Sequence, residues 1–477
     1  MTRRRLPPAV LTALLATAVL ARAPLRAVDG SPPSSAIQPE HQFGLFPQIF
    51  SVTDMAFDLS GNLVIAGTTF SRDFPTTADA ADRTCGDDGD AFVIVVSTGG
   101  DVRYATCLGG PSLDRGPSLA VSPDGSLWVL TNTCFYESDG INGCTWNGFQ
   151  ATLWRIAPGV QGYVERVPFG NIRDAIHPAD VVAGLDGSAW VLGSTSSPWL
   201  YVARPWQPTI AGETDMVVGQ YVHGETQPRL MTYLGGQRTD IGRSLAVAPD
   251  GDVVVVGSTS STDFPVVRPL QTGLGGQSDV TLTRIDRSGR WLEYSTVLGG
   301  PGYEDAPCVD VDRQGNVYLL GSTSDGSTPP FPPVPDIQMG RGLFLVSLDE
   351  AGQLRYATLA DSAVAFIEGG AVGINPVHLS VRHGGSAVIV GHYYTDELFR
   401  SGGFLAVVDR FGLPARHPGL FQRAGGGGEF VMAAVSDGRH VYVVATPFTD
   451  PSLPYYVKRL PLSALGADAH GGAADRR

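Results

Sequence analysis

The chain has 477 residues, of which 43% are hydrophobic and 17% charged, with 60 glycines, 35 prolines and a formal net charge of −14. So acidic a protein is a poor partner for nucleic acid or an anionic membrane surface, and we expect neither as a ligand. The glycine and proline content predicts many turns and little helix.

The first 27 residues have the pattern of a secretory signal peptide. Arg3, Arg4 and Arg5 precede an apolar stretch over Ala9–Ala21, and small-residue cleavage sites follow. An uncleaved membrane anchor is the alternative. Residues 28–42 are rich in proline and serine and are expected to form a flexible leader. We expect a secreted, periplasmic or cell-surface protein with no membrane span in the mature chain.

An apolar segment, Phe43–Phe50, stands alone before the first of several repeated blocks. Each block contains two short apolar runs joined by a glycine-containing turn, which is typical of a β-hairpin. A third and a fourth apolar run follow in most copies, as at Ala91 and in the segment ending Leu108-Gly109-Gly110. The blocks recur about every 64 residues, so each is a structural unit that must stack on its neighbours. The turn glycines are Gly61, Gly125, Gly187, Gly251, Gly315, Gly384 and Gly438.

Seven units of four antiparallel strands predict an all-β fold, a seven-bladed β-propeller over residues 43–462. A β-sandwich or a β-solenoid is the alternative. The last unit has three strands, at Val431–Val435, Val441–Ala445 and Tyr455–Leu460, and residues 463–477 are expected to be a disordered tail. We therefore expect Phe43–Phe50 to supply the missing fourth strand and to remove an exposed sheet edge.

The repeated block resembles the bacterial seven-bladed β-propeller repeat family, known as the SBBP repeat. The resemblance is carried by Gly61-Asn62, by Gly67 to Pro75 with its Asp-Phe-Pro ending, and by Leu108 to Gly110. It recurs at Gly257–Pro265. It implies a propeller in secreted or surface proteins and no particular reaction.

Five cysteines in an oxidising compartment predict two disulfides and one remaining thiol. Cys134 and Cys144 share one loop, and Cys85 with Cys107 would tie a loop to the fourth strand of its own blade. Cys308 is expected to be a buried small hydrophobe.

A candidate ligand surface lies in the long loops after the second strand of each blade, which share one face of the ring because antiparallel strands alternate in direction. Exposed aromatic rings there can stack on sugars or anchor a protein. The alternative is that these rings fill gaps between blades. The aromatic residues are Phe135, Tyr136, Trp146, Phe149, Trp199, Tyr201 and Trp206.

A candidate metal site consists of acidic residues that precede the first strand of several blades. Asp114, Asp240 and Glu304 each lie at the same distance before their turn glycine. If they faced the axis they could hold Ca²⁺, the one cofactor considered. The alternative is that each carboxylate caps backbone N–H groups in its own turn.

No catalytic motif is recognisable, so no catalytic residue is assigned. The leading hypothesis is a monomeric binding or scaffold module that presents long loops to a glycan or protein. An extracellular lyase or hydrolase with its site at the channel mouth is the second hypothesis, and a structural envelope protein is the third. The fold alone does not decide among them.

Overall fold

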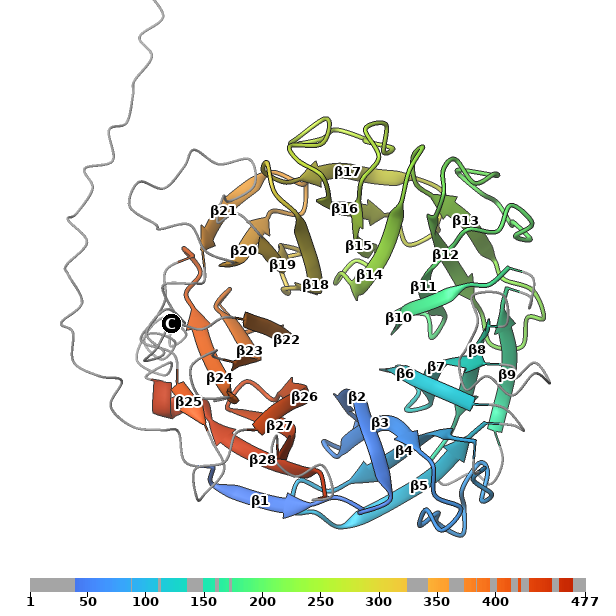
Figure 1. The fold of residues 1–477 in the computed structure, drawn as a ribbon, viewed down its shortest axis with the longest axis vertical. Helices are drawn as coiled ribbons and strands as arrows, with labels where there is room; N and C mark the ends of the chain where they lie inside the picture. Colours follow the sequence, from blue (N-terminus) through green and yellow to red (C-terminus); the bar gives the residue numbers. More distant parts are fainter. Residues whose placement is uncertain are drawn as a thin grey trace, which may run out of the picture. The chain divides into compact units, whose positions relative to one another are not determined.

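The computed structural model describes residues 39–86, 88–109, 113–134, 149–158, 163–170, 174–323, 342–359, 373–382, 384–394, 401–412, 419–421, 429–447 and 454–465. These residues form seven four-stranded antiparallel sheets arranged as the blades of a β-propeller (Figure 1). The sequence-based prediction of the fold class is therefore confirmed. Among the residues described, no helix is long and apolar enough to cross a membrane.

The first four blades follow the chain in order, with the first strand of each nearest the ring axis (Figure 1). Blade 1 contains β2 (Ile49–Phe57), β3 (Leu63–Thr69), β4 (Asp90–Val96) and β5 (Val102–Leu108). Blade 2 contains β6 (Leu113–Val121), β7 (Leu127–Cys134), β8 (Phe149–Ile156) and β9 (Tyr163–Phe169). Blade 3 contains β10 (His177–Ala183), β11 (Ala189–Thr195), β12 (Asp215–Tyr221) and β13 (Leu230–Leu234). Blade 4 contains β14 (Asp240–Val247), β15 (Val253–Thr259), β16 (Asp279–Ile285) and β17 (Leu292–Leu298).

The remaining three blades complete the ring. Blade 5 contains β18 (Glu304–Val311), β19 (Val317–Thr323), β20 (Gly342–Leu348) and β21 (Leu354–Leu359). Blade 6 contains β22 (Gly373–Val381), β23 (Ala387–Tyr394), β24 (Ser401–Val408) and β25 (Gly419–Phe421). Blade 7 contains β26 (Glu429–Ser436), β27 (His440–Pro447), β28 (Tyr456–Pro461) and, from the N-terminal region, β1 (His41–Gly44). A short 3₁₀ turn, η1 (Leu462–Leu465), follows β28.

Ring closure is made by β1, which pairs antiparallel with β28 and supplies the outermost strand of blade 7 (Figure 1). The expected bounds of this strand, Phe43–Phe50, are wrong. Residues 45–48 form a turn, closed by a bond from the Ile49 N–H to the Phe46 carbonyl at 3.2 Å, and Ile49 already belongs to β2. Pro47 lies in this turn and has no N–H for a sheet ladder, which explains the break.

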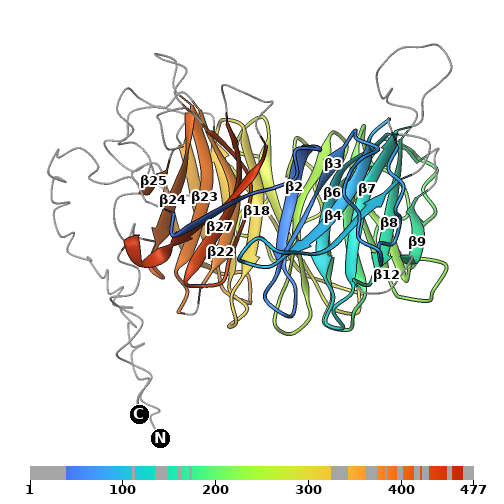
Figure 2. The ribbon, with the colours of Figure 1, turned by 90° about the horizontal axis from the view of Figure 1, so that it is seen from below.

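Burial is continuous along the central strands because each blade is covered on both faces. Every residue of β3, β11 and β15 is buried, so these strands are apolar where an exposed sheet would alternate. Among the described residues, the buried side chains fall into seven hydrophobic clusters, and each cluster lies between two neighbouring blades. The cluster between blades 7 and 1 joins Val457 to Val52 and Phe92. Figure 2 shows the strands running roughly parallel to the ring axis.

The turn glycines and cysteines largely match the sequence-based predictions. All seven turn glycines have positive φ, between 78° and 91°, a region that glycine enters without steric cost. Cys85 and Cys107 form a disulfide with Cα atoms 5.7 Å apart, and Cys308 is a buried free thiol. Cys144 and the side chain of Cys134 lie outside the described residues, so their pairing stays a prediction.

Candidate functional site

The three carboxylates predicted to bind metal are buried in the turns that join consecutive blades. The Asp240 carboxylate accepts hydrogen bonds from the Gly236 N–H at 2.7 Å and the Ser261 hydroxyl at 2.9 Å. Glu304 accepts from the Gly300 N–H at 3.0 Å and the Thr323 hydroxyl at 2.8 Å. Asp114 accepts from the hydroxyl of Thr133 in the adjacent strand. Asp240 and Glu304 therefore cap the turns that precede their strands, whereas the bond of Asp114 joins it to the neighbouring strand.

A second aspartate lies beside two of these carboxylates, Asp90 beside Asp114 and Asp215 beside Asp240, each at the start of the third strand of the preceding blade. A Cβ placed on Gly235 would lie 2.7 Å from Asp215 Oδ1 and 2.8 Å from Asp240 Oδ2, so this glycine separates the two carboxyl groups. Burial raises the pKa of Asp215 to about 6, and the charge of Asp240 contributes in the same direction. The described part of the chain contains no group of three or more Asp, Glu, His or Cys side chains placed to hold a metal ion. Ca²⁺ binding thus stays a prediction without structural support.

A polar ring lines the inner wall of the propeller, at the residue that follows a β-bulge in each innermost strand. Its members are Asp54, Ser118, Asp180, Ser244, Cys308 and His378, and in blade 7 the apolar Ala433 occupies the equivalent position. The Ser118 hydroxyl lies 2.9 Å from Asp180 Oδ1 and 3.2 Å from Asp54 Oδ2, which links blades 1, 2 and 3. Burial raises the pKa of Asp54 to about 7 and also raises that of Asp180. These half-buried carboxyl groups tie the inner strands together.

The predicted aromatic surface separates into exposed and packed rings. Trp199 is 75% exposed and Tyr201 56% exposed. Trp206 is half-buried and packs against the core cluster between blades 3 and 4, in agreement with the gap-filling alternative for this residue. Phe135, Tyr136 and Trp146, and the side chain of Phe149, lie outside the described residues. Of the five proposed ligand-binding residues, Trp199 and Tyr201 are thus the two seen exposed.

The segment that follows Trp199 does not stay on the loop face. It turns down along the outer edge of β13, where Ala203 bridges Met231 and the N–H of Trp206 donates to the Thr232 hydroxyl at 3.1 Å. Trp199, at the start of the segment, therefore lies on the loop face, whereas Trp206 lies beside β13, the outermost strand of blade 3.

A groove of about 950 Å³ opens beside Trp199, between blades 3 and 4. We call it the blade 3–4 groove. Its walls come from the starts of the innermost strands β10 and β14, from the end of β11 and from Pro307 of β18, so it opens near the ring axis. The lining includes Ala175, His177, Pro178, Ser194, Ser196, Ser197, Trp199, Thr214, Thr239, Ile241, Arg243 and Pro307.

The backbone around Trp199 is fixed although its ring is exposed. The N–H of Trp199 donates to the Ser197 hydroxyl at 3.2 Å, and the N–H of Ser197 donates to the Thr195 hydroxyl at 3.0 Å. The buried Tyr233 hydroxyl accepts from the N–H of Leu200 at 3.1 Å and donates to the Ser197 carbonyl at 2.7 Å. Leu200 is itself buried in the core between blades 2 and 3. The indole is therefore held on a rigid base.

The polar groups of the groove are one imidazole, one guanidinium and several hydroxyls. Burial lowers the pKa of His177, so its imidazole is neutral at pH 7. Arg243 pairs with Asp305 at 2.8 Å, an ion pair that is partly exposed on both sides. The Ser194 hydroxyl accepts from the N–H of Gly242 at 2.9 Å and so joins the two blades beneath the groove. The groove thus combines one exposed aromatic plane with hydrogen-bonding groups.

Sequence reasoning found Trp199 but not the rest of the groove. His177, Ser194 and Arg243 come from three strands in two blades, and no local motif brings them together. The signal that could have found them is positional, because His177 and Ser194 lie at strand ends on the loop face and Arg243 lies in the first half of β14. Combining the repeat alignment with strand direction would have placed them near Trp199.

No protein-family model matches the chain, and no curated protein matches its sequence. The resemblance to the SBBP repeat therefore stays a prediction.

Distant likenesses exist among solved structures. One is an ulvan lyase of polysaccharide lyase family PL25, bound to -[GlcA(1-4)Rha3S]-, with 10% identity, a TM-score of 0.49, and coverage of 89% of this chain and 99% of that chain. Another is a hydrazine synthase from Kuenenia stuttgartiensis, with 13% identity, a TM-score of 0.47, and coverage of 84% and 96%. A third is the β-propeller domain of the Trilobed protease from Pyrococcus furiosus, with 9% identity, a TM-score of 0.43, and coverage of 85% and 92%. Likenesses at this level carry no argument about function or site.

Proposed function

We propose that this protein is a β-propeller binding module that holds a saccharide in the blade 3–4 groove, with one sugar ring stacked on Trp199. The observation that carries the proposal is that Trp199 is 75% exposed while hydrogen bonds on both sides fix its backbone. A rigid aromatic plane loses little entropy on binding and offers an apolar face to the C–H groups of a sugar.

The rest of the groove matches the same ligand chemistry. Hydroxyl groups of serine and threonine line the walls, and the Arg243 guanidinium is a partly exposed donor. A saccharide presents both an apolar ring face and many hydroxyl groups, so it satisfies both kinds of surface. The volume of about 950 Å³ lies within the usual range for small-molecule sites.

The proposal is tested by a glycan-array screen of the full chain, followed by titration of each hit. We expect Trp199→Ala to abolish binding of the hit and Trp291→Ala to leave it unchanged. Trp291 is the matched control because it is 68% exposed and lies in the hairpin between β16 and β17, at the opposite end of the strands. Equal binding by wild type and Trp199→Ala would refute the proposal.

An extracellular lyase or hydrolase is the second candidate, and the position of His177 favours it. A neutral imidazole on the groove wall is chemically able to accept a proton from a bound substrate. Prolonged incubation of an array hit with the protein distinguishes the two functions. Cleavage products that disappear in His177→Ala would identify an enzyme, whereas an intact saccharide supports a binding module.

We further propose that the protein acts outside the cytoplasm. The Cys85–Cys107 disulfide supports this location, because such bonds persist in oxidising compartments. Mass spectrometry of the protein from culture supernatant and cell fractions would test it, and recovery only from the cytoplasm would contradict it.

A further inference from the structure

A second cavity of about 880 Å³ lies on the outer side of blades 3 and 4, and arginines dominate its charge. Four of its lining residues are Arg204, Arg229, Arg287 and Arg290, whereas Glu225 is the acidic residue on its wall. We call it the arginine cavity. Arg204 belongs to the segment along β13, Arg229 precedes β13, and the other two come from the hairpin between β16 and β17. A cluster of positive charge is unexpected on a protein with a net charge of −14.

A comparison of blade 3 with the equivalent positions of blade 4 shows that the charges in this cavity are unusual. One blade later, Arg268 and Glu293 occupy the positions that Arg204 and Arg229 occupy in blade 3. The alignment is fixed by equivalent bridges, Ala203 to Met231 and Val267 to Ser295. It is also supported by the backbone, because φ is +47° at Arg204 and +46° at Arg268.

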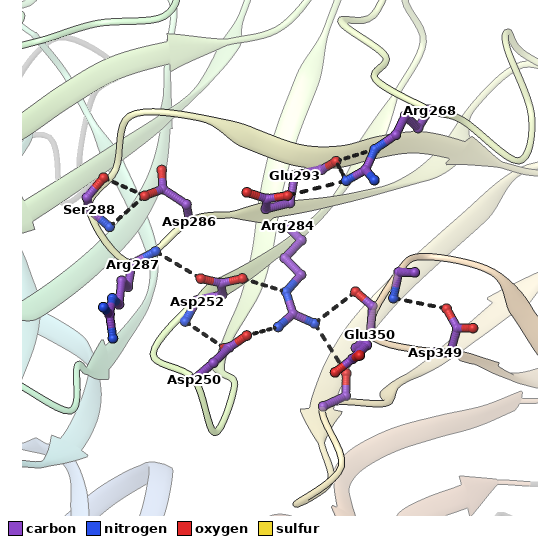
Figure 3. Close-up of polar contacts among 12 residues, drawn as sticks. Asp250, Asp252, Arg268, Arg284, Asp286, Arg287, Ser288, Glu293, Asp349 and Glu350 are labelled. Carbon is purple, nitrogen blue, oxygen red and sulfur yellow. Dashed lines mark hydrogen bonds and ion pairs between the residues drawn. The ribbon is translucent and has the colours of Figure 1, made fainter.

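Blade 4 neutralises its arginine at this position and blade 3 does not. The Arg268 guanidinium donates to the Glu293 carbonyl at 2.8 Å and pairs with its carboxylate at 3.3 Å (Figure 3). In blade 3 the residue equivalent to Glu293 is Arg229, which pairs with Glu225, so Arg204 has no acidic partner among the described residues. Two cations at one place in a fold repel each other unless an anion lies between them.

The nearby carboxylates are already engaged. Glu225 pairs with Arg229 at 2.7 Å. Asp286, in the hairpin of Arg287 and Arg290, accepts hydrogen bonds from the N–H groups of Arg290 and Trp291 and from Ser288. In the described part of the chain, no carboxylate pairs with Arg204, Arg287 or Arg290.

Asp250 and Asp252 are also occupied, since both bind the buried Arg284 guanidinium, at 2.6 and 2.9 Å. The backbone N–H of Arg287 donates to Asp252 at 3.0 Å, which fixes its main chain, while its guanidinium points away from this network (Figure 3). Arg287 is therefore anchored at its backbone and free to contact a ligand through its side chain.

We propose that the arginine cavity binds a ligand that carries two or more oxyanion groups. Guanidinium groups bind carboxylate, sulfate and phosphate through paired, charge-assisted hydrogen bonds, and the three arginines without an acidic partner converge from two blades. One oxyanion replaces the carboxylate of blade 4 between Arg204 and Arg229, and a second contacts Arg287 and Arg290. The site is separate from the blade 3–4 groove and does not depend on the saccharide proposal.

The test is isothermal titration of the full chain at low ionic strength with inorganic sulfate, citrate and a fully sulfated disaccharide. We expect the two multivalent probes to bind at least about tenfold more tightly than sulfate, and the affinity to fall as salt is added. Preference for citrate would identify a small free polyanion as the ligand type, and preference for the disaccharide an acidic sugar. No measurable binding of any probe would overturn the proposal.

Arg229→Glu is the decisive variant because it places a carboxylate at the position that Glu293 holds in blade 4. We expect it to weaken binding of the multivalent probes by at least about tenfold. Arg287→Ala is a second variant, with the same expected direction, that keeps the test informative if the first fails to fold. Arg268→Gln is the matched control and should bind as wild type, as should Trp199→Ala. Equal loss in Arg268→Gln and Arg229→Glu, or unchanged binding in Arg229→Glu, would contradict the site.

Discussion

Leu200 and Tyr233 are joined by a hydrogen bond of 3.1 Å, from the backbone N–H of Leu200 to the buried tyrosine hydroxyl. The bond matters because Leu200 follows Trp199, the exposed ring at the rim of the blade 3–4 groove. The same hydroxyl donates to the Ser197 carbonyl at 2.7 Å, so one side chain of β13 holds both ends of the Trp199 turn. The position of the proposed sugar platform thus depends on a residue that no ligand would touch.

Tyr233→Phe should loosen this turn without removing the indole. The substitution leaves the N–H of Leu200 and the carbonyl of Ser197 without partners, which should lower the free energy of unfolding by about 1–3 kcal/mol. Saccharide affinity should fall as well. Tyr221→Phe is the control, because the Tyr221 hydroxyl bonds the Pro168 carbonyl at 3.1 Å in the same inter-blade core and contacts no part of the groove. Chemical denaturation and titration of both variants check the prediction, and equal loss of affinity in the two would contradict it.

Removal of the chain up to Leu45 should destabilise the ring. The deletion takes away β1 and exposes the edge of β28, and it also removes Leu45 and Phe43 from the core between blades 7 and 1. Loss of buried side chains of this size should cost at least about 2–5 kcal/mol. Thermal unfolding measures the effect, and the control is a chain that keeps β1 and begins with an added methionine directly before Pro39. An unchanged melting curve would refute closure by β1.

The polar ring on the inner wall predicts a pH-dependent stability. Burial raises the pKa of Asp54 from 3.8 to about 7. Between these two pH values the folded state therefore keeps a proton on Asp54, whereas the unfolded state has lost it. The free energy of unfolding should therefore fall as the pH rises from about 4 to 7. Asp54→Asn removes this contribution, and the stability of the variant relative to wild type should increase over that range.

Asp124→Asn supplies the opposite control. The hydrogen bond from the Ser126 hydroxyl lowers the pKa of Asp124, so its carboxylate stabilises the folded state once ionised. Asp124→Asn should therefore lose stability relative to wild type as the pH rises towards about 4, and the difference should stay constant above that pH. Melting temperatures of the three proteins, measured below about pH 4 for Asp124 and from about pH 4 to 7 for Asp54, check both signs. A flat difference for Asp54→Asn between about pH 4 and 7 would contradict the protonated state of Asp54.

Reduction of the Cys85–Cys107 disulfide should destabilise blade 1. The bond closes a loop with a sequence separation of 22 residues, for which chain entropy predicts a contribution of about 3 kcal/mol. Cys85→Ala should melt at a lower temperature and lose its sensitivity to a reducing agent. If the melting temperature of wild type is the same with and without reductant, this disulfide contributes nothing to stability.

The sequence predicted the parts of this structure that repeat and missed those that do not. The turn glycines predicted the number of blades, because each copy of the repeat needs a residue with positive φ at the same turn. The last blade shows only three strands in the sequence, which predicted that an N-terminal strand closes the ring. The bounds of the closing strand were wrong because the run from Phe43 to Phe50 is largely apolar, so periodicity could not reveal the turn at Pro47.

The candidate site was predicted only in part. Trp199 and Trp206 look alike in the sequence, yet one is exposed and the other packs between blades, because the loop turns down along β13 after Trp199. The path of a loop depends on contacts with distant strands, which no local pattern records. The pairing of Asp215 with Asp240 around Gly235 was missed for the same reason, although both residues occupy repeated positions.

The most direct test of the central claim is a crystal structure of the protein with a saccharide identified on a glycan array. We expect a sugar ring stacked on the indole of Trp199, with its hydroxyl groups bonded to the walls of the blade 3–4 groove. A saccharide bound elsewhere on the propeller, with Trp199 free of contact, would contradict it.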